Sequence, residues 1–191
     1  MKKISLLMIS VIALLAISGC GAEKTLFQAD TFSDKDKCIV TIQNNKSLCY
    51  GDSRKDIEAI IQEDGDSGHP FVMYPSGVRV AYRGDVAVGL QLLEGSEGVY
   101  QTARGAHVGM SKAEVMNLYG LNYAYEATPN NLDYAYDMKT GKFVDKTHVF
   151  SAAVQLKREQ IFLVSAMFDG NKGGAASQIG LIDQKMAIFL E

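Results

Sequence analysis

The residues of this sequence best suited to catalysis or metal binding are three histidines and several closely spaced carboxylates. His69 stands beside Pro70 in a stretch of turn composition, His107 precedes a predicted helix, and His148 opens a predicted strand. No two of them have the spacing of a zinc site such as HxH or HExxH, so a metal site would need distant residues. We therefore expect ordinary surface or capping roles for these histidines.

One catalytic alternative stays open. The sequence contains no GxSxG elbow, P-loop or GxGxxG motif, which are the usual local signs of a hydrolase or nucleotide site. An envelope hydrolase or a small-ligand-binding protein would have to assemble its site from distant residues such as His69, His107 and Asp169. Two histidines meeting a carboxylate in one pocket would mark such a site. The sequence alone predicts no catalytic residue, no metal and no cofactor.

Two acidic loops offer oxygen ligands of the kind that bind calcium. Residues 63–68 contain several carboxylates, but without a regular alternation of ligands. Residues 169–174 begin like an EF-hand loop, yet Gly173 replaces the third ligand. Gly180 stands where that loop requires a bidentate glutamate. Both loops are therefore predicted to be solvated turns.

The first twenty residues combine a cationic start with an apolar run. Lys2 and Lys3 precede residues 4–17, a stretch of 14 residues without charge, whereas a membrane-spanning helix needs about 20. This pattern predicts a signal peptide over residues 1–19. Residues 17–20, Ile-Ser-Gly-Cys, resemble the lipobox of bacterial lipoproteins, which implies a diacylglyceryl group on Cys20. An ordinary secretory peptide with a chance cysteine is the alternative.

Two acyl chains hold a protein stably at a bilayer without a spanning helix. The lipobox resemblance therefore implies an extracytoplasmic protein that is lipid-anchored to the cell membrane or the outer membrane. With Cys20 lipidated, Cys38 and Cys49 remain as an even pair in an oxidising compartment. They flank residues 43–46, Gln-Asn-Asn-Lys, which have hairpin-turn chemistry.

A disulfide across this hairpin is the natural interpretation of Cys38 and Cys49. It would close a loop of 12 residues and stabilise the fold by roughly 3 kcal/mol in the chain-entropy model. A metal or redox pair is the alternative, and neither a CxxC spacing nor a neighbouring histidine supports it.

Composition limits the class of partner. Without Lys2 and Lys3, the expected mature chain has 17 basic and 22 acidic residues, a net charge of −5. Mild acidity without a basic cluster argues against nucleic acid. Hydrophobic residues make up 47% of the sequence, so the chain can build a core as one domain or two small ones.

The middle of the chain contains a repeated pattern. Residues 51–61 and 109–120 place glycine, serine, an acidic residue and aliphatic residues at the same offsets. In each copy the serine and the acidic residue have the spacing of a helix cap, and a glycine follows the apolar stripe. These residues are Ser53, Asp56 and Gly65 in the first copy and Ser111, Glu114 and Gly120 in the second. The repeat predicts two short helices.

After each predicted helix the apolar period changes to two, which is typical of strands with one buried face. The alternating stretches are residues 78–83, Val86, Val88, Leu90 and Leu92 in the first copy and residues 132–138, 150–156 and 161–168 in the second. Each copy is thus a short helix on an antiparallel sheet, and the fold class is α+β with two tandem modules. Residues 178–190 suit either a helix or a final strand.

The expected organisation has four parts: a signal peptide (1–19), a lipidated polar tether (20–36), a first module (37–98) and a second module (99–191). A capped Gly-x-Ser-x-x-(Asp/Glu)-hydrophobic helix before a three-stranded meander resembles the SmpA/OmlA (BamE-like) module. Two such modules in tandem are similar to the beta-lactamase inhibitor proteins. The resemblance covers residues 48–168 and is most family-like over 102–111. It implies a fold and a habit of contact with proteins.

One face of the predicted sheet is a candidate partner-binding surface. If the large apolar residues of the strands face the helices, the opposite face carries small residues, with arginines in one module and aspartates in the other. Small side chains allow close approach, and charges at the rim orient a partner. A curved solvent face, or a face where the modules meet, is the alternative. The candidate residues are Arg79, Ala81, Arg83, Asp133, Ala135 and Asp137, with Ala87, Gly89 and Ala153 as further small residues.

These features together predict a membrane-anchored lipoprotein of the cell envelope that binds a protein partner and does not bind nucleic acid. A structural lipoprotein that spaces membrane and wall is a further alternative. Such a protein would have no discrete partner and little sensitivity to point changes on the sheet.

Overall fold

The computed structural model describes residues 27–68, 70–149, 151 and 158–187. The expected signal peptide, Cys20, His69 and most of the strand expected over 150–156 lie outside the described residues. The helices are η1 (Asp34–Lys37), α1 (Arg54–Ile61), α2 (Lys112–Tyr119), η2 (Gly170–Lys172) and α4 (Gln184–Ala187). None of the helices in this part of the chain is long and apolar enough to cross a bilayer.

The described strands form two antiparallel sheets, which confirms the α+β class predicted from the sequence. Strands β2 (Ser47–Cys49), β1 (Cys38–Thr41) and β7 (Tyr100–Thr102) form a small sheet in that order. The larger sheet has eight strands in the order β3 (Asp66–Gly68), β4 (Phe71–Met73), β5 (Val78–Arg83), β6 (Val86–Leu92), β11 (Ala175–Asp183), β10 (Ile161–Asp169), β8 (Asn131–Asp137) and β9 (Lys142–Phe143).

The large sheet consists of two meanders that meet at their last strands. The first meander, β4–β5–β6, follows α1, and the second, β8–β10–β11, follows α2. Strands β6 and β11 pair across the centre, with Leu90 opposite Leu181. Each repeat found in the sequence therefore begins one helix-then-meander half, and both halves share one sheet. Residue 98, the expected module boundary, lies between β6 and β7.

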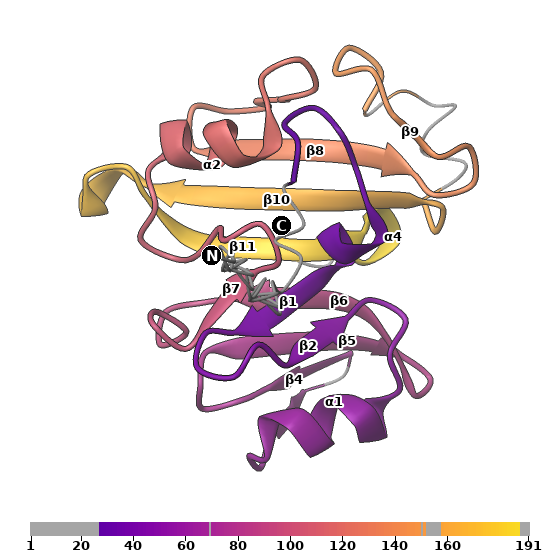
Figure 1. The fold of residues 1–191 in the computed structure, drawn as a ribbon, viewed down its shortest axis with the longest axis vertical. Helices are drawn as coiled ribbons and strands as arrows, with labels where there is room; N and C mark the ends of the chain where they lie inside the picture. Colours follow the sequence, from indigo (N-terminus) through magenta and orange to yellow (C-terminus); the bar gives the residue numbers. More distant parts are fainter. Residues whose placement is uncertain (1–26, 69, 150, 152–157, 188–191) are drawn as a thin grey trace, which may run out of the picture.

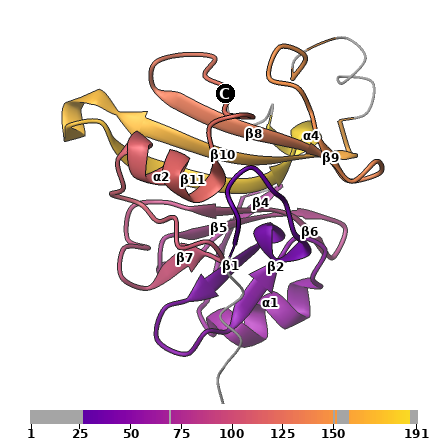
Figure 2. The same cartoon turned by 45° about the horizontal axis from the view of Figure 1, so that its top comes forward.

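The main core lies between the large sheet and a second layer made of the small sheet, α1 and α2 (Figures 1 and 2). The helices α1 and α2 contribute Ile57 and Val115 to this core, and the small sheet contributes Ile39 and Leu48. Each of these side chains is fully or almost fully buried. Burial of a side chain of this size stabilises a fold by about 1.5–3 kcal/mol, so this core fixes the two layers together.

Both predicted helices begin at the predicted serines. The Ser53 side chain accepts a hydrogen bond from the Asp56 N–H, and Ser111 forms a full capping box with Glu114. The prediction for the end of the first helix was wrong: α1 ends before Gln62, which adopts the left-handed conformation, three residues ahead of Gly65. The left-handed conformation strains the backbone of Gln62, whereas a glycine would adopt it without that strain.

Gly120 does follow α2, with a φ of 104° that favours glycine, but its ψ of 172° lies outside the left-handed helical region. A Cβ here would lie 2.2 Å from a carboxylate oxygen of Asp30. This glycine therefore serves a close approach between α2 and the N-terminal segment.

A β-bulge changes the predicted facing of β6. The register between β5 and β6 shifts between Ala81 and Tyr82, so that Val88 has no partner directly opposite. As a result Ala87 packs in the main core and Val88 packs on the other face. The sequence prediction placed both the other way round, because an extra residue in one strand reverses the alternation beyond it. Leu90 and Leu92 keep their predicted place in the main core.

The predicted hairpin and its disulfide are present. Strands β1 and β2 pair with Cys38 opposite Cys49, and the two sulfur atoms are bonded. The hairpin carries the small sheet, because β1 also pairs with β7 on its other edge. The C-terminal region forms strand β11 and then α4, so the two alternatives considered for residues 178–190 are both realised in part.

Residues 27–36, the described part of the expected tether, are packed on the body. We call residues 27–36 the N-terminal segment. The Asp30 N–H donates to the carbonyl of Tyr119, and Phe32 stacks on Tyr136 with ring centroids 3.7 Å apart. Arg104 reaches this segment from the loop after β7 and contacts Asp36. A composition that suits a solvated tether therefore also suits a segment held by specific polar contacts.

Candidate functional site

The sheet face turned away from the helices divides into two parts. One part is covered by a second, smaller core in which Met186 of α4 and Val149 pack on Ala81, Ala135 and Ile182. We call this the covered part. The other part runs across β4, β5, β6, β11 and β10 beside it. Its six residues, which we call the open patch, are Met73, Arg79, Gln91, Ser165, Met167 and Gly180.

The predicted partner-binding face is therefore only partly available. Its small residues Ala81 and Ala135 are buried under the protein's own chain, and Asp133 is buried as well. Ala81 and Ala135 lie on the predicted face, away from Val80 and Tyr134, but α4 and Val149 cover them, which no local pattern in the sequence indicates. A surface that is already covered cannot receive a partner in the folded protein.

The remaining charged candidates are mostly engaged within the chain. Arg83 pairs with the fully buried Asp183 at 3.1 Å, and Tyr50 donates to the same carboxylate. Burial raises the pKa of the Asp183 carboxyl, against the lowering effect of the Met186 N–H, Arg83 and Tyr50. Asp137 accepts hydrogen bonds from two backbone N–H groups of its own turn. These residues hold structure in place.

Arg79 is the exception. Its Nε donates to Oε1 of Gln91 at 2.5 Å, and its guanidinium carbon lies 5.1 Å from the ring centroid of Phe71. No carboxylate among the described residues is paired with it, and burial lowers its pKa. A half-buried cation without a counter-charge is unfavourable by itself. Arg79 is thus the least compensated charge of the predicted set.

The open patch has methionines at both ends and a small residue in its middle. Met73 is 37% exposed and lies directly opposite Arg79, while Met167 is 45% exposed on β10. Between them lie Gln91 and then Gly180, both buried, which pair with each other across β6 and β11. Exposed methionine and arginine are characteristic of protein-binding surfaces, because the thioether adapts its shape and arginine combines stacking with hydrogen bonding.

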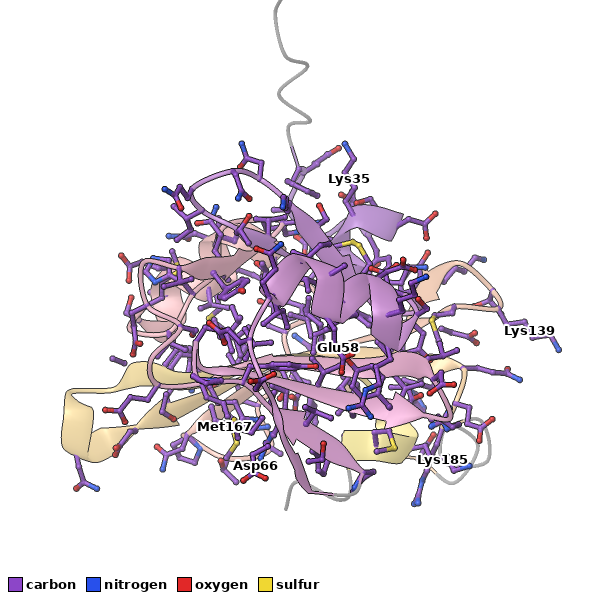
Figure 3. The ribbon with its side chains drawn as sticks, turned by 90° about the horizontal axis from the view of Figure 1, so that it is seen from below. Lys35, Glu58, Asp66, Lys139, Met167 and Lys185 are labelled. Carbon is purple, nitrogen blue, oxygen red and sulfur yellow. A yellow bond between two sulfur atoms is a disulfide. The ribbon has the colours of Figure 1, made fainter. Side chains whose placement is uncertain are left out.

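The open patch faces away from the N-terminal segment. Figure 3 shows Lys35 of that segment on one side of the molecule and Met167 on the opposite side, with Asp66 near Met167. Asp66 pairs with Met73 on the edge of the same sheet. Because Cys20 is only seven residues before Phe27, a lipid on that residue would lie within about 25 Å of the segment. A membrane there would leave the open patch uncovered.

The histidines do not meet in the described structure. The His107 ring is hydrogen-bonded to the neighbouring carbonyl of Val108, while His148 lies in an exposed turn beside Asp145. Asp169 caps η2 by accepting from the Asn171 N–H. Among the described residues no group of three histidine, cysteine or acidic side chains could hold a metal ion. His69 lies outside the described residues. Of the residues considered for a site built from distant parts of the chain, His107 and Asp169 each make their own local contacts.

A polar hollow lies beside α1 and is lined by Arg54, Glu58, Gln62, Glu63, Asp64 and Gly65. Arg54 and Glu58 pair with each other at 2.7 Å, and the Glu63 carboxylate accepts from the Ser76 N–H. The carboxylates considered for calcium are therefore engaged in part with the protein itself. Within the hollow, Arg54 and Glu58 therefore compensate each other's charge.

No protein-family model, curated protein or solved structure matches this chain. The open patch was not defined by any motif in the sequence. Its one predicted member is Arg79, and the signal that could have extended the prediction is the alternation that puts Met73, Ser165 and Met167 on the same face.

Proposed function

We propose that this protein is a lipid-anchored, extracytoplasmic binding protein that holds a protein partner on its open patch. The observation that carries the proposal is the place of that patch: a methionine-flanked, arginine-containing surface on the side opposite the N-terminal segment. Lipid on Cys20 would tether the opposite side to the cell membrane or the outer membrane. The arrangement of two helix-then-meander halves supports the resemblance to tandem SmpA/OmlA-like modules.

Site-specific crosslinking in cells tests the surface. A photoreactive residue at Met167 should give a discrete crosslinked species, because this position lies within the open patch. Val86 is the matched control, since its exposed fraction of 45% equals that of Met167 and it lies outside the patch. Equal crosslinking at both positions, or none at Met167, would contradict the proposal.

The anchor is tested separately. A Cys20→Ser variant removes the sulfur that would receive the lipid, and the protein should then move from the membrane fraction to the soluble fraction. A variant that stays in the membrane fraction would show that another feature holds it there. The crosslink at Met167 should weaken in this variant, since the anchor raises the local concentration near a membrane-bound partner.

A further inference from the structure

The small sheet has an outer face with two exposed apolar side chains. Ile39 of β1, Leu48 of β2 and Tyr100 of β7 belong to the main core. Because side chains alternate along a strand, the residues next to them point away from the large sheet. We call these residues the outer face: the Cys38–Cys49 disulfide, Val40, Ile42, Ser47, Val99 and Gln101.

Ile42 and Val99 lie side by side on the outer face. The Ile42 N–H donates to the Val99 carbonyl at 2.9 Å, which continues the register of β1 and β7 by one pair. Ile42 is 40% exposed and Val99 is 43% exposed. Neither core of the described structure includes Val40, Ile42 or Val99. These side chains therefore form an apolar surface on the outside of the described structure.

The residues of the outer face are uncharged, and charges stand at its margin. Lys46 comes directly before Ser47 and Glu97 lies two residues before Val99, and both charged residues are exposed. The Glu97 carboxylate accepts a hydrogen bond from the Gly95 N–H of its own loop. Removing apolar surface from water is favourable, whereas burying a charge is costly. An uncharged face with a charged margin suits the boundary between the headgroups and the acyl chains of a bilayer.

The outer face points to the side of the molecule that carries the N-terminal segment. The small sheet belongs to the layer opposite the large sheet (Figure 2), and Figure 3 shows Lys35 of the N-terminal segment on the side away from Met167. Strand β1 begins at Cys38, directly after η1. A lipid on Cys20, within about 25 Å of Phe27, would therefore hold a bilayer on this side.

We infer that the outer face of the small sheet, through Ile42 and Val99, lies on the bilayer that holds the lipid of Cys20. The anchor keeps this face near the bilayer at a high effective concentration, so a contact that would be weak by itself becomes populated. The inference rests on the proposed function and adds an orientation to it. The small sheet faces the membrane, and the open patch faces the protein partner.

A bilayer fits the outer face better than a second copy of the chain does. The three strands have three or four residues each, so the face covers about 15 Å by 13 Å, or roughly 200 Å². A stable protein interface buries about 800 Å² on each partner. The outer face consists of aliphatic, hydroxyl, amide and disulfide groups, whereas aromatic and arginine side chains anchor such interfaces. A bilayer needs only a small apolar contact in addition to the lipid anchor.

Tryptophan fluorescence tests this contact, because the sequence contains no tryptophan and one substitution provides a single probe. Ile42→Trp and Met167→Trp are produced in bacterial cells from the full-length chain and reconstituted in phosphatidylcholine vesicles with brominated acyl chains, which quench a nearby tryptophan. Met167 is the matched control, since its exposed fraction of 45% is close to that of Ile42 and it lies on the far side (Figure 3). Relative to vesicles without bromine, the probe at position 42 should lose fluorescence, and the probe at position 167 should not.

Flotation of the same vesicles separates this inference from the proposed function. Protein that does not float lacks a working lipid anchor, which would overturn the proposed function and this inference with it. Protein that floats but shows no quenching at position 42, or equal quenching at both positions, keeps the anchor and overturns only the inference. Emission at position 42 that shifts to shorter wavelength with protein concentration, without quenching, would assign the outer face to a second copy and also overturn the inference.

A second substitution tests the outer face as a whole. Val99→Glu, added to the Ile42→Trp variant, should reduce the quenching, because a carboxylate beside position 42 keeps the face in water. Val86→Glu is the control, since Val86 is 45% exposed and lies on β6, outside the outer face. Quenching that both glutamate substitutions leave unchanged would overturn the assignment to this face.

Discussion

Two arginines of this protein, Arg104 and Arg79, show how differently the same side chain can be placed. Arg104 is almost fully buried, with 1% of its side chain exposed, and its bidentate pair with Asp36 has N–O distances of 2.5 and 2.9 Å. Its other N–H groups donate to the carbonyls of Gln28, Thr31 and Leu118. All five donors are used. Arg79, in contrast, makes one hydrogen bond with the described residues.

The difference separates the structural role of Arg104 from the binding role that we propose for the open patch around Arg79. Arg104 joins the N-terminal segment to α2 and to the loop after β7, and no donor is left for an external group. Arg79 lies on a sheet face, stacked on Phe71, and its Nη groups make no hydrogen bond with the part of the chain that the structure describes. Arg83 is intermediate, because it is partly exposed but paired with the buried Asp183. The three arginines should therefore differ in the free energy of unfolding that each substitution removes.

The largest effect is expected for Arg104→Ala. Removing this side chain leaves Asp36 buried without its counter-charge, which typically lowers the free energy of unfolding by about 3–5 kcal/mol. Urea unfolding measures the loss. Arg54→Ala is the control, because an exposed helix pair contributes only about 0.3–0.5 kcal/mol. Equal losses in both variants would remove the structural role assigned to Arg104.

The disulfide should give the next largest effect. Replacing both Cys38 and Cys49 with serine removes the crosslink of the β1–β2 hairpin, which closes a loop with a sequence separation of 11. The expected loss is roughly 3 kcal/mol in the chain-entropy model. Unfolding of the wild type with and without reductant provides the comparison. If the unfolding midpoint of the wild type is the same with and without reductant, this expectation is contradicted.

Arg83→Ala should cost about 1–2 kcal/mol, less than Arg104→Ala. Asp183 loses one charged partner but keeps the Tyr50 hydroxyl and the Met186 N–H, so a part of its hydrogen bonding survives. The same urea experiment places Arg83 between the two other arginines. A loss as large as that of Arg104→Ala would show that exposure does not reduce the contribution of this pair.

Asp183 also predicts a pH dependence. Its pKa in the folded chain is raised above the ordinary value of 3.8, first by burial, so folding favours the protonated form. Its contribution to stability is present in full below about pH 4 and is lost as the pH rises through the raised pKa. The wild type should therefore lose stability relative to Asp183→Asn as the pH is raised from acidic to neutral. A gap that is constant with pH would contradict the shift.

The smallest effect on stability is expected for Arg79→Ala. This substitution removes a cation without a paired carboxylate but also takes the hydrogen bond of Arg79 from the buried Gln91, so the net loss should be about 1 kcal/mol or less. The crosslink at Met167 should nevertheless weaken, because Arg79 lies in the open patch. A large destabilisation would place Arg79 with Arg104 among the structural arginines and end the contrast between them.

Local patterns predicted the elements well, and the exceptions have identifiable causes. Ser53 and Ser111 begin helices as expected, because a cap depends on residues three positions apart. The alternation in β5 and β8 predicted the correct faces. For Val88 the predicted face was wrong, because a bulge reverses the alternation there. No local pattern marks such a bulge, since it depends on how β5 and β6 pair.

The candidate site was less predictable than the fold. Arg79 was named as a surface residue of the sheet, and the structure keeps it accessible. Ala81 and Ala135 were named with it, but residues from distant parts of the chain, Val149 and Met186, cover them. Gln91 entered no prediction, because a glutamine in an apolar strand has no distinctive signal until its neighbours are known.

The sequence by itself therefore determined the two capped helices, the antiparallel strands, the disulfide hairpin and the resemblance of residues 17–20 to a lipobox. These features depend on residues that are near one another in the chain, so short-range sterics and hydrogen bonding specify them. Only the tertiary structure decided which part of the sheet stays open and which arginine keeps unused donors. That outcome depends on the packing of segments such as α4 and the N-terminal segment, whose contacts lie tens of residues away in sequence.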